Sequence, residues 1–107
     1  MNSFANNQFD AIERLIFEEG LRIETIDVHP ELDLMLIILN TKAVLRQSIS
    51  SYAYLKKADK AQLLQYELIA GGTGIHWPEL DEDLSLKGFL SDELRKFVKT
   101  DKDSMAA

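Results

Sequence analysis

The chain has 107 residues and no cysteine, and its 18 acidic and 12 basic side chains give a formal net charge of −6. A protein without cysteine has no disulfide framework, no thiolate zinc site and no cysteine nucleophile. The sequence pI of about 4.8 also argues against nucleic acid as a partner, because binding to phosphate backbones needs clustered lysine and arginine.

Composition and hydropathy predict a single cytoplasmic domain. Apolar residues make up 46% of the chain and charged residues 28%, which is typical of a globular protein. The longest apolar run, Leu34 to Leu39, is far shorter than the ~20 residues that a membrane-spanning helix needs. The first residues also lack the basic and apolar pattern of a signal peptide. We therefore expect neither export nor contact with a membrane.

Residues 1–20 are expected to form an N-terminal helical extension. Apolar side chains recur at the spacing of one helix face between residues 8 and 19, at Phe9, Ile12, Leu15 and Ile16. Asn6 or Asn7 is expected to cap the start of this helix, and Gly20 is expected to end it. The stripe can pack on the chain's own sheet or on a second copy, so a homodimer through this helix is one expected partnership.

Residues 21–90 are expected to form an α+β core that begins with three antiparallel strands. Leu21 to Val28 alternates β-branched and polar residues, and Pro30 then interrupts the pattern because it cannot donate to a ladder. Leu34 to Leu39 is apolar on both faces, which is typical of a central strand. Ala43 to Ile49 follows after only three residues, a spacing that predicts a hairpin.

A second hairpin is predicted further along the chain. A helical segment capped by Ser50 or Ser51 comes first, and strands at Tyr66 to Ala70 and Gly74 to Trp77 flank the turn at Gly71-Gly72. The predicted fold is a single α+β domain with one small antiparallel sheet of about five strands, made of two hairpin units, and flanking helices.

Residues 91–107 are expected to form a C-terminal helix and a flexible tail. Asp83 or Ser85 is expected to cap a short helix from Leu86 to Leu90, and Ser91 is expected to cap the last helix. Three apolar residues of that last helix are expected to face inward, namely Leu94, Phe97 and Val98.

The most unusual stretch runs from Gly71 to Ser85 and holds the only tryptophan, one of the two histidines and four acidic residues. From Glu79 to Asp92, five acidic residues and Lys87 leave a local charge of −4. Like charges this close repel one another unless water, a cation or a basic partner offsets them. An acidic loop after Pro78 is therefore expected, and the candidate partner-binding residues are His76, Trp77, Glu79, Asp81, Glu82 and Asp83.

These residues also have structural interpretations. Trp77 and Leu80 can anchor the loop in the core, because a buried indole contributes a large apolar area. His76 beside Glu79 suggests metal ligation or acid–base chemistry, but the pair lacks a further ligand or a nucleophile. We therefore expect no enzymatic activity, no catalytic residue, no bound metal and no cofactor.

The run from Gly74 to Ser85, GIHWPELDEDLS, together with the strand at Tyr66-Glu67-Leu68, resembles the bacterial family catalogued as domain of unknown function 2442. The resemblance covers roughly Leu21 to Leu90 and implies a small α+β domain without an established enzymatic activity. Members are often encoded beside a family catalogued as domain of unknown function 4160, and such pairs are proposed as toxin and antitoxin. Some relatives add a DNA-reading helix-turn-helix domain, for which too few residues follow Leu90 here.

Two functional hypotheses result. The first is a non-enzymatic protein-interaction module, antitoxin-like, whose acidic loop binds a small basic protein encoded nearby. The alternative is a small metal- or ligand-binding regulatory domain that uses His76 with Glu79 and Asp81. In a third, purely structural interpretation, the loop only locks the last hairpin to the following helix.

Overall fold

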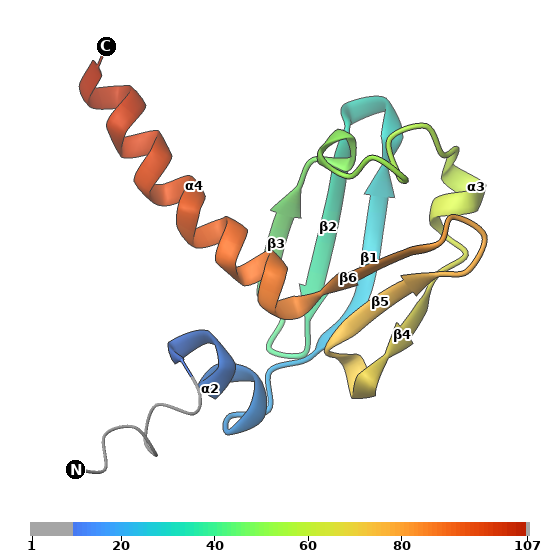
Figure 1. The fold of residues 1–107 in the computed structure, drawn as a ribbon, viewed down its shortest axis with the longest axis horizontal. Coiled ribbons are helices and arrows are strands. Elements are labelled where there is room, and N and C mark those ends of the chain that lie inside the picture. The colour runs from blue at the N-terminus through green and yellow to red at the C-terminus, as the bar shows by residue number, and fades with distance from the viewer. Residues whose placement is uncertain (1–9, 107) are drawn as a thin grey trace.

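The structure is a computed structural model that describes residues 10–106, with side chains to residue 98. It contains two three-stranded antiparallel sheets (Figure 1). The first sheet consists of β1 (Ile23–His29), β2 (Leu34–Leu39) and β3 (Val44–Gln47), and the second of β4 (Glu67–Ile69), β5 (Gly74–Trp77) and β6 (Glu82–Ser85). The helices are α2 (Ala11–Phe17), α3 (Lys60–Leu63) and α4 (Leu86–Ala106), and single 3-10 turns occur at Pro30–Leu32, Ile49–Ser51 and Ala70–Gly72.

The predicted α+β class is confirmed, but the strands do not form the expected single sheet of about five strands. The two hairpins belong to separate sheets, and a sixth strand, β6, pairs with β5. Tyr66 joins the second hairpin to the first sheet, because its hydroxyl lies 2.9 Å from the Thr25 hydroxyl and accepts from the Ile26 amide at 3.4 Å. Both sheets contribute to one apolar core, which includes Ile26 and Ile75.

The central strand of the first sheet is β2, as its sequence predicts. Its side chains alternate between the core and a half-buried face. Met35 and Ile37 are completely buried, whereas Ile38 lies on the opposite face and is half-buried. The run was expected to be apolar on both faces, and the structure buries one face much more deeply than the other.

Helix α2 is shorter than expected and starts at a different cap. Asp10 accepts from the Glu13 amide at 2.7 Å, and the Glu13 carboxylate accepts from the Asp10 amide at 3.0 Å. Asn6, Asn7 and Phe9, which the sequence placed in or before the helix, lie outside the described residues. Ile16 is buried in the chain's own core. The left-handed conformation of Gly20, with φ of 78°, follows the helix as predicted.

The segment between the sheets is less helical than expected. Ser50 and Ser51 lie inside the 3-10 turn at Ile49–Ser51 rather than at the start of an α-helix. The Ser50 amide and hydroxyl donate to the Asp33 carboxylate at 2.8 and 2.6 Å. The α-helical turn in this segment is α3, which Asp59 caps by accepting from the Gln62 amide at 2.8 Å.

Helix α4 is continuous from Leu86 to Ala106, so the predicted helix start at Ser91 is wrong. Ser85 caps it, since the Gly88 amide donates to Ser85 Oγ at 3.0 Å. The helix begins against the core, where Leu86 and Phe89 are buried, and its later turns project away from the rest of the molecule (Figure 1). Three side chains expected to face inward are therefore exposed by 55%, 66% and 58%, namely Leu94, Phe97 and Val98. No helix in the described range is long and apolar enough to span a membrane.

Candidate functional site

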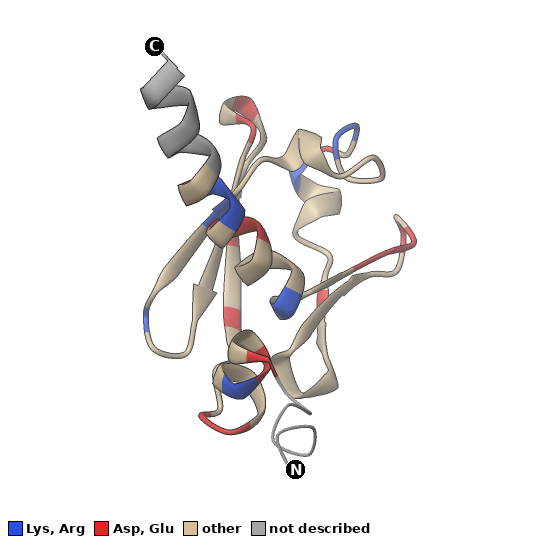
Figure 2. Ribbon diagram, turned by 60° about the vertical axis from the view of Figure 1, so that its left-hand side comes forward, with Lys and Arg blue, Asp and Glu red and all other residues tan. Residues whose placement is uncertain are grey.

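The acidic residues lie at the tip of a β-hairpin. Strand β5 is followed by a turn at residues 78–81 and then by β6, where Glu82 pairs with Trp77 and Leu84 with Ile75. The loop that was expected after Pro78 is thus a tight turn at residues 78–81, and the residues that follow this turn form strand β6. Figure 2 shows red acidic segments at this tip. Residues 74–85 are called the acidic hairpin below.

Trp77 holds the acidic hairpin in the core. Its side chain is completely buried, and its indole Nε1 donates to the Leu63 carbonyl oxygen at 3.0 Å. Leu80 is partly buried and packs against the same core. Trp77 was a candidate for direct contact with a partner, and its burial rules out that contact in this conformation. The interpretation as a core anchor is the one that fits.

In the described part of the chain, no lysine or arginine neutralises the carboxylates of the acidic hairpin. Among the side chains that the structure describes, no lysine or arginine forms an ion pair with Glu79, Asp81, Glu82 or Asp83. The nearest lysine in sequence, Lys87, instead binds α2, at 3.0 Å from Glu13 Oε2 and 3.5 Å from Asp10 Oδ2. The negative charge therefore faces the surroundings of the protein.

His76 lies on the outer face of the second sheet, between two acidic residues. It pairs in register with Glu67 of β4 on one side and Asp83 of β6 on the other. Its Nδ1 hydrogen-bonds the Asp83 carboxylate. No three acidic or histidine side chains of the described residues are arranged to hold a metal ion. The structure thus does not bring His76, Glu79 and Asp81 together as the metal hypothesis requires.

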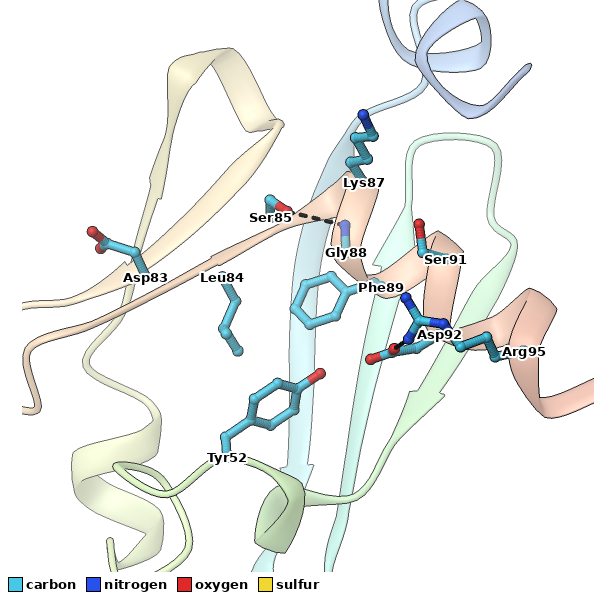
Figure 3. Close-up of a pocket in the computed structure, with 10 residues that line it drawn as sticks. All are labelled: Tyr52, Asp83, Leu84, Ser85, Lys87, Gly88, Phe89, Ser91, Asp92 and Arg95. Carbon is cyan, nitrogen blue, oxygen red and sulfur yellow. Dashed lines mark hydrogen bonds and ion pairs between the residues drawn. The ribbon is translucent and has the colours of Figure 1, made fainter. Parts of the chain in front are cut away.

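A cavity of about 420 Å³ lies beside the acidic hairpin, between β6 and the start of α4 (Figure 3). Tyr52 forms its lower edge in this view, Asp83 and Leu84 come from β6, and Asp92 and Arg95 come from α4. Tyr52 and Arg95 were not among the candidate residues predicted from the sequence. No local pattern could have indicated them, because residues far apart in the chain meet here only after folding.

Tyr52 is partly buried and lies near carboxylates. Its hydroxyl donates to Gln47 Oε1, and its ring packs edge-on against Phe89 with centroids 6.4 Å apart. Burial, followed by the Asp92 and Glu82 carboxylates, raises the pKa of Tyr52 to about 12. On the rim of the cavity, Arg95 Nη1 donates to Asp92 Oδ1 at 2.7 Å.

A model of the family described as "Protein of unknown function (DUF2442)" matches residues 25–93. The chain belongs to this family. The matched range of this DUF2442 protein contains both sheets, apart from the first two residues of β1, and ends in α4 at Glu93. Helix α2 lies before the matched range. The resemblance stated from the sequence is thereby confirmed.

Two solved structures share the fold of this DUF2442 chain. A crystal structure of a protein of unknown function from Rhodospirillum rubrum is 25% identical in sequence, with a TM-score of 0.60. The match covers 68% of this chain and 88% of the Rhodospirillum rubrum chain. An NMR structure of an uncharacterised protein from Chromobacterium violaceum is 22% identical in sequence, with a TM-score of 0.62. The match covers 85% of this chain and 79% of the Chromobacterium violaceum chain. No curated protein matches the chain.

Proposed function

We propose that this DUF2442 protein is a non-enzymatic protein-interaction module whose acidic hairpin binds a basic surface on a small partner protein. The resemblance to pairs proposed as toxin and antitoxin suggests the kind of partner, a small protein encoded next to this one. In that pair this chain is the antitoxin-like member.

The observation that supports the proposal is the uncompensated charge of the acidic hairpin. Glu79 and Asp81 are exposed on a turn, next to the half-buried Glu82. The described part of the chain offers these three carboxylates no lysine or arginine. Crowded negative charges raise the energy of the free protein, and a basic partner surface lowers it. Such a surface also accelerates the encounter with an oppositely charged partner.

The anchoring of the turn adds to this argument. Trp77 and Leu80 fix the backbone on both sides of Glu79, through the indole bond to the Leu63 carbonyl and through packing against the core. A partner therefore meets carboxylates that are already held in place, and binding loses less conformational entropy than it would with a floppy loop.

The test is the rate of association with the protein encoded by the neighbouring gene, measured over a series of salt concentrations. The triple variant Glu79→Lys, Asp81→Lys and Glu82→Lys is expected to associate at least about tenfold more slowly and with a flatter salt dependence. The matched control is Glu18→Lys, Glu19→Lys and Glu31→Lys, which changes the net charge equally at exposed positions away from the hairpin. Equal rates for the two triple variants would contradict the proposal.

The alternative function, a metal- or ligand-binding regulatory domain using His76, receives no support from the geometry. His76 is engaged with Asp83, and the carboxylates of Glu79 and Asp81 do not join it in a ligand group within the described residues. We do not propose it as a second function.

A second copy of this chain, bound through the N-terminal helix, is a further proposed partner. The stripe that motivated it is partly used inside the chain, because Ile16 is buried and Ile12 packs against the core. Leu15 is left 39% exposed. Sedimentation velocity over a range of protein concentrations tests whether this remainder supports a dimer.

A further inference from the structure

We propose that the cavity between β6 and α4 receives an arginine side chain of the basic partner. This inference rests on the proposed function and makes it more specific, since it names one partner residue and the place where that residue binds. The cavity has a volume of about 420 Å³ and adjoins the acidic hairpin through Asp83 and Leu84 (Figure 3).

The apolar part of the cavity suits the long stem of an arginine. Leu84, Phe89 and Tyr52 line it, and Figure 3 shows the Leu84 side chain and the two aromatic rings next to one another. The hydrogen bond from Tyr52 to Gln47 and the edge contact with Phe89 hold the tyrosine ring in one orientation. Aliphatic stems pack on such surfaces, and a guanidinium interacts favourably with a tyrosine ring.

The Asp92 carboxylate gives the cavity a group that favours a cation. Asp92 comes from α4, on the side of the cavity opposite β6, whereas the Asp83 carboxylate on β6 points away from the cavity (Figure 3) and binds His76. Lys87 also borders the cavity, but its ammonium points away and binds Glu13 and Asp10 on α2. Burial is the largest cause of the raised pKa of Tyr52, and the carboxylates of Asp92 and Glu82 raise that pKa further, so their negative charge reaches this side of the cavity.

Arg95 shows which cation fits. Its guanidinium already binds Asp92 at 2.7 Å on the rim of the cavity, yet its side chain is 75% exposed. An exposed ion pair three residues apart on a helix contributes little to stability, so a partner arginine can replace Arg95 at small cost. A planar guanidinium binds a carboxylate through two parallel hydrogen bonds, which the ammonium of lysine cannot do. The proposed occupant is therefore arginine rather than lysine.

The test is a titration of the full-length, isotope-labelled protein with capped peptides, followed by amide chemical shifts. The probe carries three arginines separated by glycines, and matched peptides carry citrulline or lysine in place of each arginine. The arginine peptide is expected to shift the amides of Gly88, Ser91 and Asp92. The citrulline peptide, which keeps the shape but lacks the charge, is expected to leave them unchanged, and the lysine peptide to bind more weakly.

Substitutions on α4 locate the binding. Asp92→Asn is expected to weaken binding of the arginine peptide about tenfold, because a charge-assisted hydrogen bond is lost. Arg95→Gln is expected to tighten it by about a factor of two to five, since the internal competitor is removed. Glu93→Gln is the matched control, because it changes the same charge one residue further along the helix and does not line the cavity. Unchanged amide spectra away from the substitution verify that each variant is folded.

The outcomes separate this inference from the proposed function. Equal effects of Asp92→Asn and Glu93→Gln, equal binding of the lysine peptide, or shifts caused by the citrulline peptide each overturn the arginine site. None of these results changes the association rates of the two triple variants, on which the proposed function depends. If instead the rates of the triple variants are equal, the proposed function fails, whatever the peptides do.

Discussion

The two sheets have the same number of strands and the same antiparallel order, but they differ in what they bury. In the first sheet, the central strand β2 turns Met35 and Ile37 completely into the core. In the second sheet, β4 is exposed along its whole length, and β5 alone is deeply buried, through Ile75 and Trp77. One anchored strand is thus enough to hold a charged surface. In the second sheet, the buried contacts that stabilise the fold lie on one face, and acidic residues lie on the other face and at the tip.

The strongest way to break this arrangement is Trp77→Ala. The change removes the largest buried side chain and leaves the Leu63 carbonyl without its indole donor. We expect the free energy of unfolding to fall by about 3–5 kcal/mol. Urea unfolding followed by circular dichroism measures this cost, since the substitution removes the only tryptophan fluorophore. A loss below about 1 kcal/mol would mean that the second sheet does not depend on this anchor.

The first sheet is expected to show the same contrast between two neighbouring residues. Ile37→Ala opens a cavity at a completely buried position and should cost about 2–5 kcal/mol. Ile38→Ala is the matched control, because the same atoms are removed from the half-buried opposite face. Its cost should be clearly smaller. Similar costs in urea unfolding would show that both faces of β2 are equally packed.

The sequence predicted the first sheet better than the second for a physical reason. A six-residue apolar run such as Leu34–Leu39 is too short for a typical helix and must be shielded from water, so it favours a central strand. The β6 sequence Glu82–Ser85 is acidic and has a low strand propensity, so its pattern indicated a loop. It forms a strand because β5 lies beside it and Leu84 packs against the core. That tertiary context is absent from the local sequence.

The candidate site was predictable in part. The crowding of acidic residues after Trp77 is visible in the sequence, and the structure leaves those residues without lysine or arginine partners in its described part. The cavity was not predictable, because it brings Tyr52 from the first half of the chain against Asp92 on α4. The exposure of Phe97 could not be predicted from the sequence either, because an apolar stripe does not show whether this part of the helix packs on the core or extends away from it.

A smaller effect is expected on the outer face of the second sheet. Asp83→Asn removes the charge that hydrogen-bonds His76, but the Asp83 side chain is 70% exposed. We expect the free energy of unfolding to change by less than about 0.5 kcal/mol in either direction, as for other exposed ion pairs. The measurement is urea unfolding at neutral pH. A large loss would show that this face contributes to stability, and the division of roles within the second sheet would then be wrong.

The smallest effect concerns the contact between α4 and α2, which lies outside both sheets. Capping hydrogen bonds from backbone amides and then the Lys87 ammonium hold the pKa values of Asp10 and Glu13 below their usual range, and the Glu13 carboxylate raises the pKa of Lys87. A lowered carboxyl pKa contributes stability that is present above the ordinary value of about 4 and is lost as the pH falls through the folded-state pKa. A raised lysine pKa contributes stability that is present below about pH 10 and is lost at higher pH.

Lys87→Met should therefore lower the urea midpoint slightly near pH 7 and leave it unchanged at low pH, where both carboxyls are protonated. Lys56→Met is the matched control, because Lys56 is exposed and forms no ion pair within the described residues. A midpoint difference between wild type and Lys87→Met that persists unchanged at low pH would show that the lysine stem, rather than its charge, joins the two helices.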